Sequence, residues 1–413
     1  MRLYIDPGTG SMLFAILIGI IGALNYLLKS WIVKLRFILS GGKKVEGDTE
    51  KLPFIIFSDD KRYWNVFEPV CRELNRRGMD VVYMTASADD PAINNPYEHI
   101  KGQFIGDGNK AFAKLNFLKA TMVLSTTPGL DVYQWKRSKD VGYYVHMLHA
   151  ASEAVAYRMF GIDYYDAVLL SGEYQVQDVR ALEKLRGLPE KELVKIGIPY
   201  MDEMARRLRD AGPTPPHKRT VLLAPSWGKS AILQKYGGKI IDELLATGYH
   251  VIIRPHPQSF KSETELMEKL MRDYPESDRL EWNRDNDNFE VLCRSDIMIS
   301  DFSGVIFDFA LVYDKPVIYA DTEFDKSPYD AWWLDKPLWT FTALPRIGEK
   351  LTPENMSGLR GMIDACLTDP RYEAGRQEVR AETWEHPGEG AVRAANYLLA
   401  KYQELKSQEE GKK

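Results

Sequence analysis

Histidines are the residues of this 413-residue sequence whose type and spacing best suit chemistry at neutral pH. His146 and His149 lie in YVHMLHAASEAV, at the end of a predicted strand. An imidazole with a pKa of about 6.5 can accept the proton of an acceptor alcohol. The spacing also fits a metal pair on one helical turn, but Glu153 is the only obvious further ligand, so we assign no metal site to these histidines. Whether the protein needs a divalent metal stays open. Purely structural histidines are the third interpretation.

A second candidate is His256, which follows a predicted buried strand in the sequence Arg-Pro-His-Pro. The flanking prolines restrict the backbone and so hold the imidazole in place. The guanidinium of Arg254 beside this imidazole suits an anionic group such as a diphosphate. The alternative is a solvated or hydrogen-bonded loop histidine.

The stretch SDIMISDFSGVIFDFALVYDKPVIYA, residues 296–320, has the pattern strand, polar turn, helix, strand. Its turn places the hydroxyls of Ser300 and Ser303, together with Gly304 and free backbone N–H groups, at a helix N-terminus. Such an end favours an anion, for example a phosphate. Simple N-capping by Ser300, Asp301 or Ser303 explains the same residues.

The elements that position these residues alternate between strands and helices, which indicates parallel α/β sheets. The segment GPTPP at 212–216 is the best domain boundary. We predict an N-terminal anchor and linker at 1–51, an α/β domain at 52–216, a second at 217–385, and a C-terminal helix with a polar tail at 386–413. Ligands of such sheets bind outside the carboxyl ends of the strands, so we expect a cleft between the two domains.

The composition narrows the possible partners and compartments. With 45% hydrophobic and 27% charged residues the chain has the composition of an ordinary globular protein. Its net charge is −5, and the sequence has no basic stripe that would indicate nucleic-acid binding. The three cysteines, Cys71, Cys293 and Cys366, are far apart and form no CxxC pair. They are typical of buried thiols in a reducing compartment. The oligomeric state stays open.

The N-terminal segment predicts a membrane anchor. Residues 12–28 carry no charge, and with their neighbours they approach the roughly 20 residues that span a bilayer. Cations follow this segment at Lys29, Lys34, Arg36 and beyond, whereas only Arg2 precedes it. By the positive-inside rule we expect one membrane-spanning helix, with the large C-terminal part in the cytoplasm.

Several stretches, in this order, resemble the CDP-glycerol glycerophosphotransferase family, the teichoic-acid primases and polymerases. The resemblance runs from about residue 141 to 398. It is carried by LHA at 148–150, YYDAVLLSGEY at 164–174, GIPYMD at 197–202, APSW at 224–227, RPHP at 254–257, SDFSG at 300–304 and DF at 308–309.

The resemblance implies a GT-B-like fold, with two Rossmann-like domains facing a cleft. It also implies transfer of glycerol phosphate from CDP-glycerol to a hydroxyl of a lipid-linked acceptor. His149 matches the family's first histidine, the base, and His256 the second, which meets the diphosphate. The remaining expected donor contacts are Arg254, Ser300, Asp301, Ser303, Gly304, Ser226 and Lys229, and His146 and Glu153 are expected on the acceptor side.

The sequence departs from the family at two of these motifs. His149 is flanked by Leu148 and Ala150, where the family has Trp-His-Gly-Thr, and Lys229 stands in for an arginine that usually follows Ala-Pro-Thr-Trp. Two other functions therefore stay open. One is a glycosyltransferase or epimerase of the same fold that uses a nucleotide-sugar, and the other is a non-catalytic nucleotide-binding relative.

Overall fold

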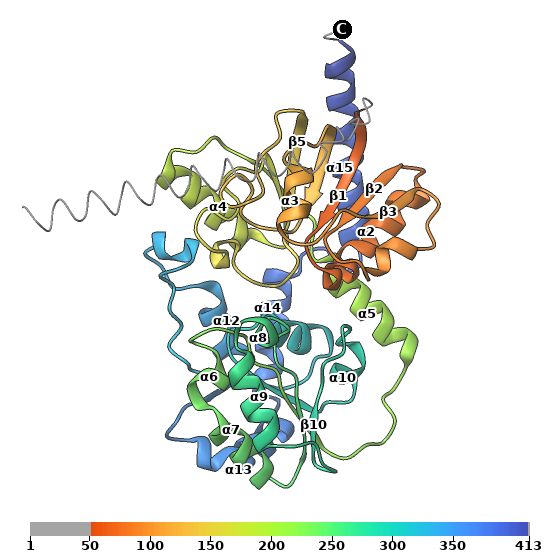
Figure 1. Ribbon diagram of the computed structural model, residues 1–413. Coiled ribbons are helices and arrows are strands. Elements are labelled where there is room, and N and C mark those ends of the chain that lie inside the picture. The colour runs from red at the N-terminus through yellow and green to blue at the C-terminus, as the bar shows by residue number, and fades with distance from the viewer. Residues whose placement is uncertain (1–50, 412–413) are drawn as a thin grey trace, which may run out of the picture. The chain divides into compact units, whose positions relative to one another are not determined.

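Two parallel β-sheets organise the chain, which we describe from a computed structural model covering residues 51–411 (Figure 1). The strand order is β3-β2-β1-β4-β5-β6-β7 in the first sheet and β10-β9-β8-β11-β12-β13 in the second. Leu52–Lys413 forms one compact unit. We call residues 52–211 together with the last helix the N-terminal lobe, and residues 220–383 the C-terminal lobe.

The N-terminal lobe contains the seven strands of the first sheet and the helices between them. The strands are β1 (Leu52–Ser58), β2 (Val81–Thr85), β3 (Ile100–Phe104), β4 (Ala120–Ser125), β5 (Val141–Met147), β6 (Ala167–Leu170) and β7 (Glu192–Lys195). The helices are α2 (Trp64–Arg76), α3 (Asn109–Leu115), α4 (Glu173–Arg186) and α5 (Pro199–Ala211). Strand β4 is buried at every position, as expected of a central parallel strand that is covered on both faces.

The C-terminal lobe repeats this plan with six strands. These are β8 (Thr220–Leu223), β9 (His250–Ile253), β10 (Leu280–Trp282), β11 (Ile297–Ser300), β12 (Val317–Ala320) and β13 (Gly348–Leu351). The helices are α6 (Ile232–Tyr236), α7 (Gly238–Ala246), α8 (Ser259–Ser262), α9 (Thr264–Asp273), α10 (Phe289–Cys293), α11 (Val305–Phe307), α12 (Trp339–Ile347), α13 (Leu359–Thr368) and α14 (Glu373–Thr383). A π-helix, η4 (Asp308–Val312), continues α11.

The last helix, α15 (Gly390–Glu410), returns to the N-terminal lobe (Figure 1). Its Ala394, Ala395 and Leu398 are buried in the same apolar core as strands β1 and β4. The turn before it is fixed by Asp202 of α5, whose carboxylate accepts hydrogen bonds from the backbone N–H groups of Gly388 and Gly390. The N-terminal lobe is therefore built from both ends of the described chain.

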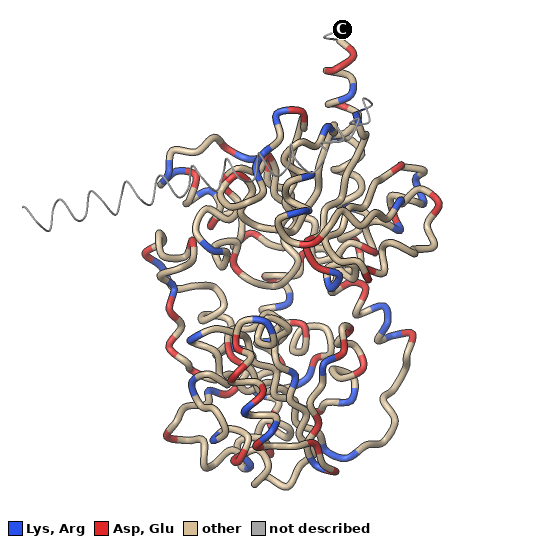
Figure 2. Tube along the Cα trace, in the orientation of Figure 1, with Lys and Arg blue, Asp and Glu red and all other residues tan. Residues whose placement is uncertain are grey.

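Charged residues of both signs are interspersed along both lobes (Figure 2). A few of them are buried where the lobes meet. Asp330 of the C-terminal lobe is fully buried and accepts hydrogen bonds from the backbone N–H of Phe160, at 2.7 Å, and from Arg186 of α4. An apolar cluster of Val155, Leu182, Ala331, Leu334 and Leu338 surrounds this contact. The two lobes are thus fastened together along one side.

The predicted fold class needs one correction. Among residues 51–411 no helix has both the length and the apolar character that crossing a bilayer requires. The predicted membrane-spanning helix, residues 12–28, lies outside the described residues. The fold of the described residues is therefore two parallel-sheet α/β domains. The predicted domain boundaries stay predictions.

Candidate functional site

A cavity of about 310 Å³ lies where the two lobes meet. We call it the interlobe cavity. The N-terminal lobe lines it with His149, Ala150, Ser152, Glu153, Ala156 and Tyr157, and the C-terminal lobe with Ser226, Trp227, His256, Phe302, Ser303, Gly304, Phe324, Tyr329, Leu338, Thr340 and Phe341. Many of these residues follow the carboxyl ends of strands β5, β8, β9 and β11, where ligands of parallel sheets bind.

His149 enters the cavity from the loop after β5. Its Nδ1 lies 2.6 Å from Oγ1 of Thr126, which follows β4, and its ring packs edge-on against Tyr63 at a centroid distance of 5.1 Å. Burial, and secondarily the charge of Arg62, lowers the pKa of His149 to about 4, so the imidazole is neutral at neutral pH. When Nδ1–H donates to Thr126, Nε2 has the free lone pair that a general base needs.

His256 enters the cavity from the opposite lobe with a complementary tautomer. Its Nδ1 accepts a hydrogen bond from the backbone N–H of Gln258 at 3.1 Å, so Nε2 carries the proton of the neutral ring. Burial first, and then the charges of Arg62 and Arg254, lowers its pKa to about 4. The ring therefore offers an N–H donor to an acceptor in the cavity.

Some residues of the turn after β11 line the cavity, and others form hydrogen bonds behind the cavity wall. Ser303 and Gly304 line the cavity, and Gly304 comes so close to the N-terminal lobe that a Cβ built on it would lie 3.4 Å from Cβ of Ala150. Asp301 is fully buried and accepts backbone hydrogen bonds at 2.9 Å from both Ser226 and Ile232. Asp301 therefore joins this turn to the turn after β8 rather than facing a ligand.

Three further residues expected at the donor lie outside the cavity lining. Ser300 is buried, and its hydroxyl donates to the carbonyl of Ala224 at 2.6 Å. Arg254 donates to Asn283 and to the carbonyl of Asp285, and burial lowers the pKa of its guanidinium. Lys229 is exposed. The first two hold neighbouring loops because carbonyl and amide acceptors lie within reach of their side chains.

The residues expected on the acceptor side serve the packing instead. His146 is fully buried, outside the lining, with Nε2 3.0 Å from the hydroxyl of Tyr157, and burial lowers its pKa to about 3. Glu153 touches the cavity, but its carboxylate accepts hydrogen bonds from the backbone N–H and the hydroxyl of Thr340. These two hydrogen bonds join the two lobes. Within residues 51–411 no cluster of three potential ligands could hold a metal ion.

The sequence prediction missed two polar loops beside His149. The loop after β1 brings Asp59 and Arg62, and the loop after β4 brings Thr126 and Thr127; Thr127 donates to Asp59 at 3.0 Å. Burial raises the pKa of Asp59. Only their position in the sequence could have indicated these loops, because both directly follow buried strands.

Asp308, the first residue of η4, is a buried carboxyl that the prediction left without a role. Its Oδ1 has no hydrogen-bond partner, and burial raises its pKa from 3.8 to about 7. Interruptions of helices by π-turns are frequent at functional sites. Here the interruption lies four residues after Gly304 of the cavity wall.

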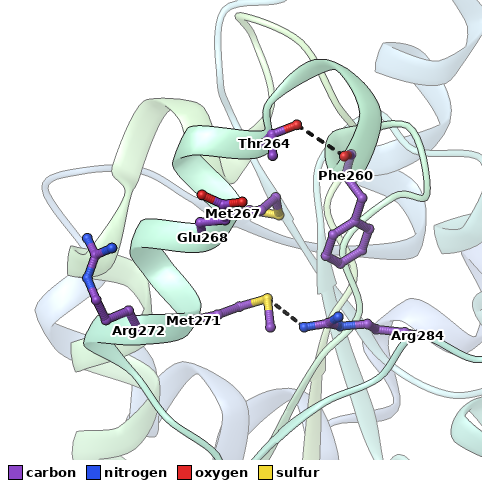
Figure 3. Close-up of a pocket in the computed structure, with 7 residues that line it drawn as sticks. All are labelled: Phe260, Thr264, Met267, Glu268, Met271, Arg272 and Arg284. Atoms are coloured by element: carbon purple, nitrogen blue, oxygen red, sulfur yellow. Dashed lines mark hydrogen bonds between the residues drawn. The ribbon is translucent and has the colours of Figure 1, made fainter.

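A second hollow, of about 420 Å³, lies over α9 and the loop before α10 (Figure 3). Phe260, Met267 and Met271 supply apolar walls, and Arg284 lies across the ring of Phe260 at 5.1 Å. Arg284 also donates to the sulfur of Met271. None of the predicted site residues borders this hollow, whereas His149, His256 and Ser303 line the interlobe cavity.

Comparisons with known proteins agree with this architecture. Among solved structures, the chain is similar to the wall teichoic acid polymerase TagF, solved with CDPG, at 14% identity and a TM-score of 0.54, covering 87% of this chain and 90% of that one. It is also similar to UDP-GlcNAc 2-epimerase from Methanocaldococcus jannaschii, at 14% identity and a TM-score of 0.55, covering 85% and 100%. At these identities the likeness shows the fold alone.

A third structure, MnaA from S. aureus with UDP, matches at 13% identity and a TM-score of 0.56, covering 85% of this chain and 97% of that one. No relative is found among curated protein sequences. The family model of CDP-glycerol:poly(glycerophosphate) glycerophosphotransferase matches residues 149–331, which span His149, His256 and the turn after β11. Over this region, somewhat less than half of its length, the chain resembles the CDP-glycerol glycerophosphotransferase family of enzymes.

Proposed function

We propose that the protein transfers glycerol phosphate from CDP-glycerol to an acceptor hydroxyl in the interlobe cavity. The observation that carries the proposal is the pair of neutral histidines that enter one cavity from opposite lobes, with Ser303 and Gly304 beside them. The family match supports the donor. One histidine can accept a proton, and the other donates a hydrogen bond.

In the proposed reaction Nε2 of His149 takes the proton of the acceptor hydroxyl. The hydroxyl oxygen forms a bond to the phosphorus that carries glycerol, and the bond from that phosphorus to the bridging oxygen breaks. Its electron pair leaves with CMP. His256 and the turn at Ser303 donate hydrogen bonds to the diphosphate oxygens on which charge increases. In phosphoryl transfer, positioning and such electrostatic stabilisation supply most of the catalysis.

We further propose a lipid-linked cell-envelope glycan or teichoic-acid-like polymer as the acceptor, reached at the cytoplasmic face of the cell membrane. The family description names poly(glycerophosphate) as its acceptor, which supports this class. The three cysteines are free and buried, as is usual in a reducing compartment. Radiolabelled glycerol phosphate should pass from CDP-glycerol to a lipid-extractable product in membranes that contain the protein.

Calorimetric titration of the purified full-length protein with CDP-glycerol, CMP and UDP tests the donor. We expect cytidine-selective binding, which weakens at least tenfold in His256→Ala together with a loss of turnover, because the Nε2–H donor is removed. His217→Ala, an exposed loop histidine, is the matched control and should behave as wild type. Full activity of His256→Ala would contradict the proposal.

A nucleotide-sugar reaction is the second candidate, because two structures of similar fold are a UDP-GlcNAc 2-epimerase and a protein bound to UDP. The same cavity could hold any nucleoside diphosphate, since the fold does not decide the donor. Tight binding of UDP but not of CMP in the same titration would favour this candidate.

A further inference from the structure

The loop after β1, residues 59–63, lies outside the lining of the interlobe cavity but is held beside it by contacts to both lobes. Thr127 of the N-terminal lobe donates to Asp59, and Lys261 of α8 in the C-terminal lobe pairs with Asp60 at 3.3 Å. Lys261 is five residues after His256. The loop therefore spans from the His149 side of the cavity to the His256 side.

Arg62 is the cation of this loop that lies on the side of Tyr63 and His149. Its guanidinium carbon lies 5.4 Å from the centre of the Tyr63 ring, which itself packs against His149. Its Nε forms an ion pair with a carboxylate oxygen of Asp60 at 3.5 Å, but the geometry is not that of a hydrogen bond. Within residues 51–411 the guanidinium donates no hydrogen bond, although only 27% of the side chain is exposed. A half-buried guanidinium with open donors is suited to an anionic ligand.

The charge of Arg62 acts on both histidines. It is the first charge, after burial, that lowers the pKa of His149, and likewise that of His256. By geometry, Arg62 lies over Tyr63, which packs against His149, and the neighbouring Asp60 reaches Lys261 on the segment that follows His256. A phosphoryl group passing from a leaving group beside His256 to an oxygen beside His149 would therefore stay within its field.

We propose that Arg62 binds the phosphoryl group that is transferred, the one bearing glycerol, and not the phosphate that stays with CMP. The assignment rests on the proposed function. A guanidinium presents two parallel N–H groups to two phosphoryl oxygens. During transfer the negative charge spreads over the equatorial oxygens of this group while the bond to CMP breaks and the bond to the acceptor oxygen forms. Arg62 holds these oxygens, and His149 receives the proton.

The test titrates full-length Arg62→Ala with CDP-glycerol, which has both phosphates, and with CMP, which has only the phosphate that is not transferred. We expect CDP-glycerol affinity to fall at least tenfold, or kcat to fall about 100-fold, while the Kd of CMP stays within twofold of wild type. Unchanged CMP binding also shows that the variant is folded. Arg62→Lys keeps the charge but loses the paired donors, so its turnover should lie between those of Arg62→Ala and wild type.

Lys61→Ala is the matched control. Lys61 is the neighbouring cation on the same loop, but it pairs with Asp89 away from the cavity, and we expect wild-type affinity and turnover. Equal weakening of CMP and CDP-glycerol in Arg62→Ala would overturn the assignment, and so would wild-type affinity together with wild-type kcat. Failure of the wild-type protein to bind CDP-glycerol would instead refute the proposed function, and this assignment with it.

Discussion

Replacing Asp308 with asparagine tests whether a buried carboxyl weakens the fold near neutral pH. Its Oδ1 has no hydrogen-bond partner, and burial raises its pKa from 3.8 to about 7. The folded protein therefore binds this proton more tightly than the unfolded chain does. The fold is stabilised at low pH, and that advantage is lost as the pH rises from about 4 to 7.

The size of the effect follows from the shift. One pKa unit corresponds to about 1.4 kcal/mol, so holding the ionised carboxyl in the fold costs about 4 kcal/mol at pH 8. At pH 5 the Asp308 carboxyl of the folded protein is almost fully protonated, and the cost to stability is only about 1.5 kcal/mol. We therefore expect the stability gain of Asp308→Asn over wild type to be about 2.5 kcal/mol larger at pH 8 than at pH 5.

Urea unfolding of both proteins at the two pH values measures this difference, provided that their m-values agree. Asp278→Asn, an exposed position on the same lobe, is the control and should track wild type at both pH values. A stability difference that does not change with pH would refute the inference that Asp308 is buried and protonated. Destabilisation by asparagine that grows toward pH 8 would do so as well.

Two further predictions concern the cavity and the contact between the lobes. In the free protein burial lowers the pKa of both His149 and His256 to about 4, so kcat/KM should stay level down to about pH 5 and fall only below it; an acid limb near pH 6.5 would contradict this environment. Asp330→Ala should lower the free energy of unfolding by about 3 kcal/mol, because the buried Arg186 keeps only Asp163 as a carboxylate partner; a urea midpoint equal to that of wild type would count against it.

The position of the cavity residues could be predicted because it depends on topology. Carboxyl ends of parallel strands share one edge of a sheet, so residues that follow β5, β8, β9 and β11 had to lie near a common cleft. His149, His256 and Ser303 came together for this reason, although they are far apart in sequence. The strands around them were readable as apolar runs between polar turns.

The directions of individual side chains were less predictable, because local hydrogen-bond partners decide them. Asp301 accepts hydrogen bonds from three backbone N–H groups, and Arg254 donates to Asn283. The spacing of residues in the sequence does not predict these partners. The loop of Arg62 resembles any polar turn after a strand. Strand β3, with the sequence IKGQF, was missed because an edge strand does not need the apolar pattern of a central one.

The return of α15 to the N-terminal lobe fixes an order of events during synthesis. The face of β1, β4 and α2 that Ala394, Ala395 and Leu398 cover is made early, but the helix that covers it is made only after the C-terminal lobe. Until then this apolar surface lacks its native partner while the whole C-terminal lobe is being made. Domains usually fold as units from the N-terminus onward, whereas here the first lobe completes its core only after the second has been made.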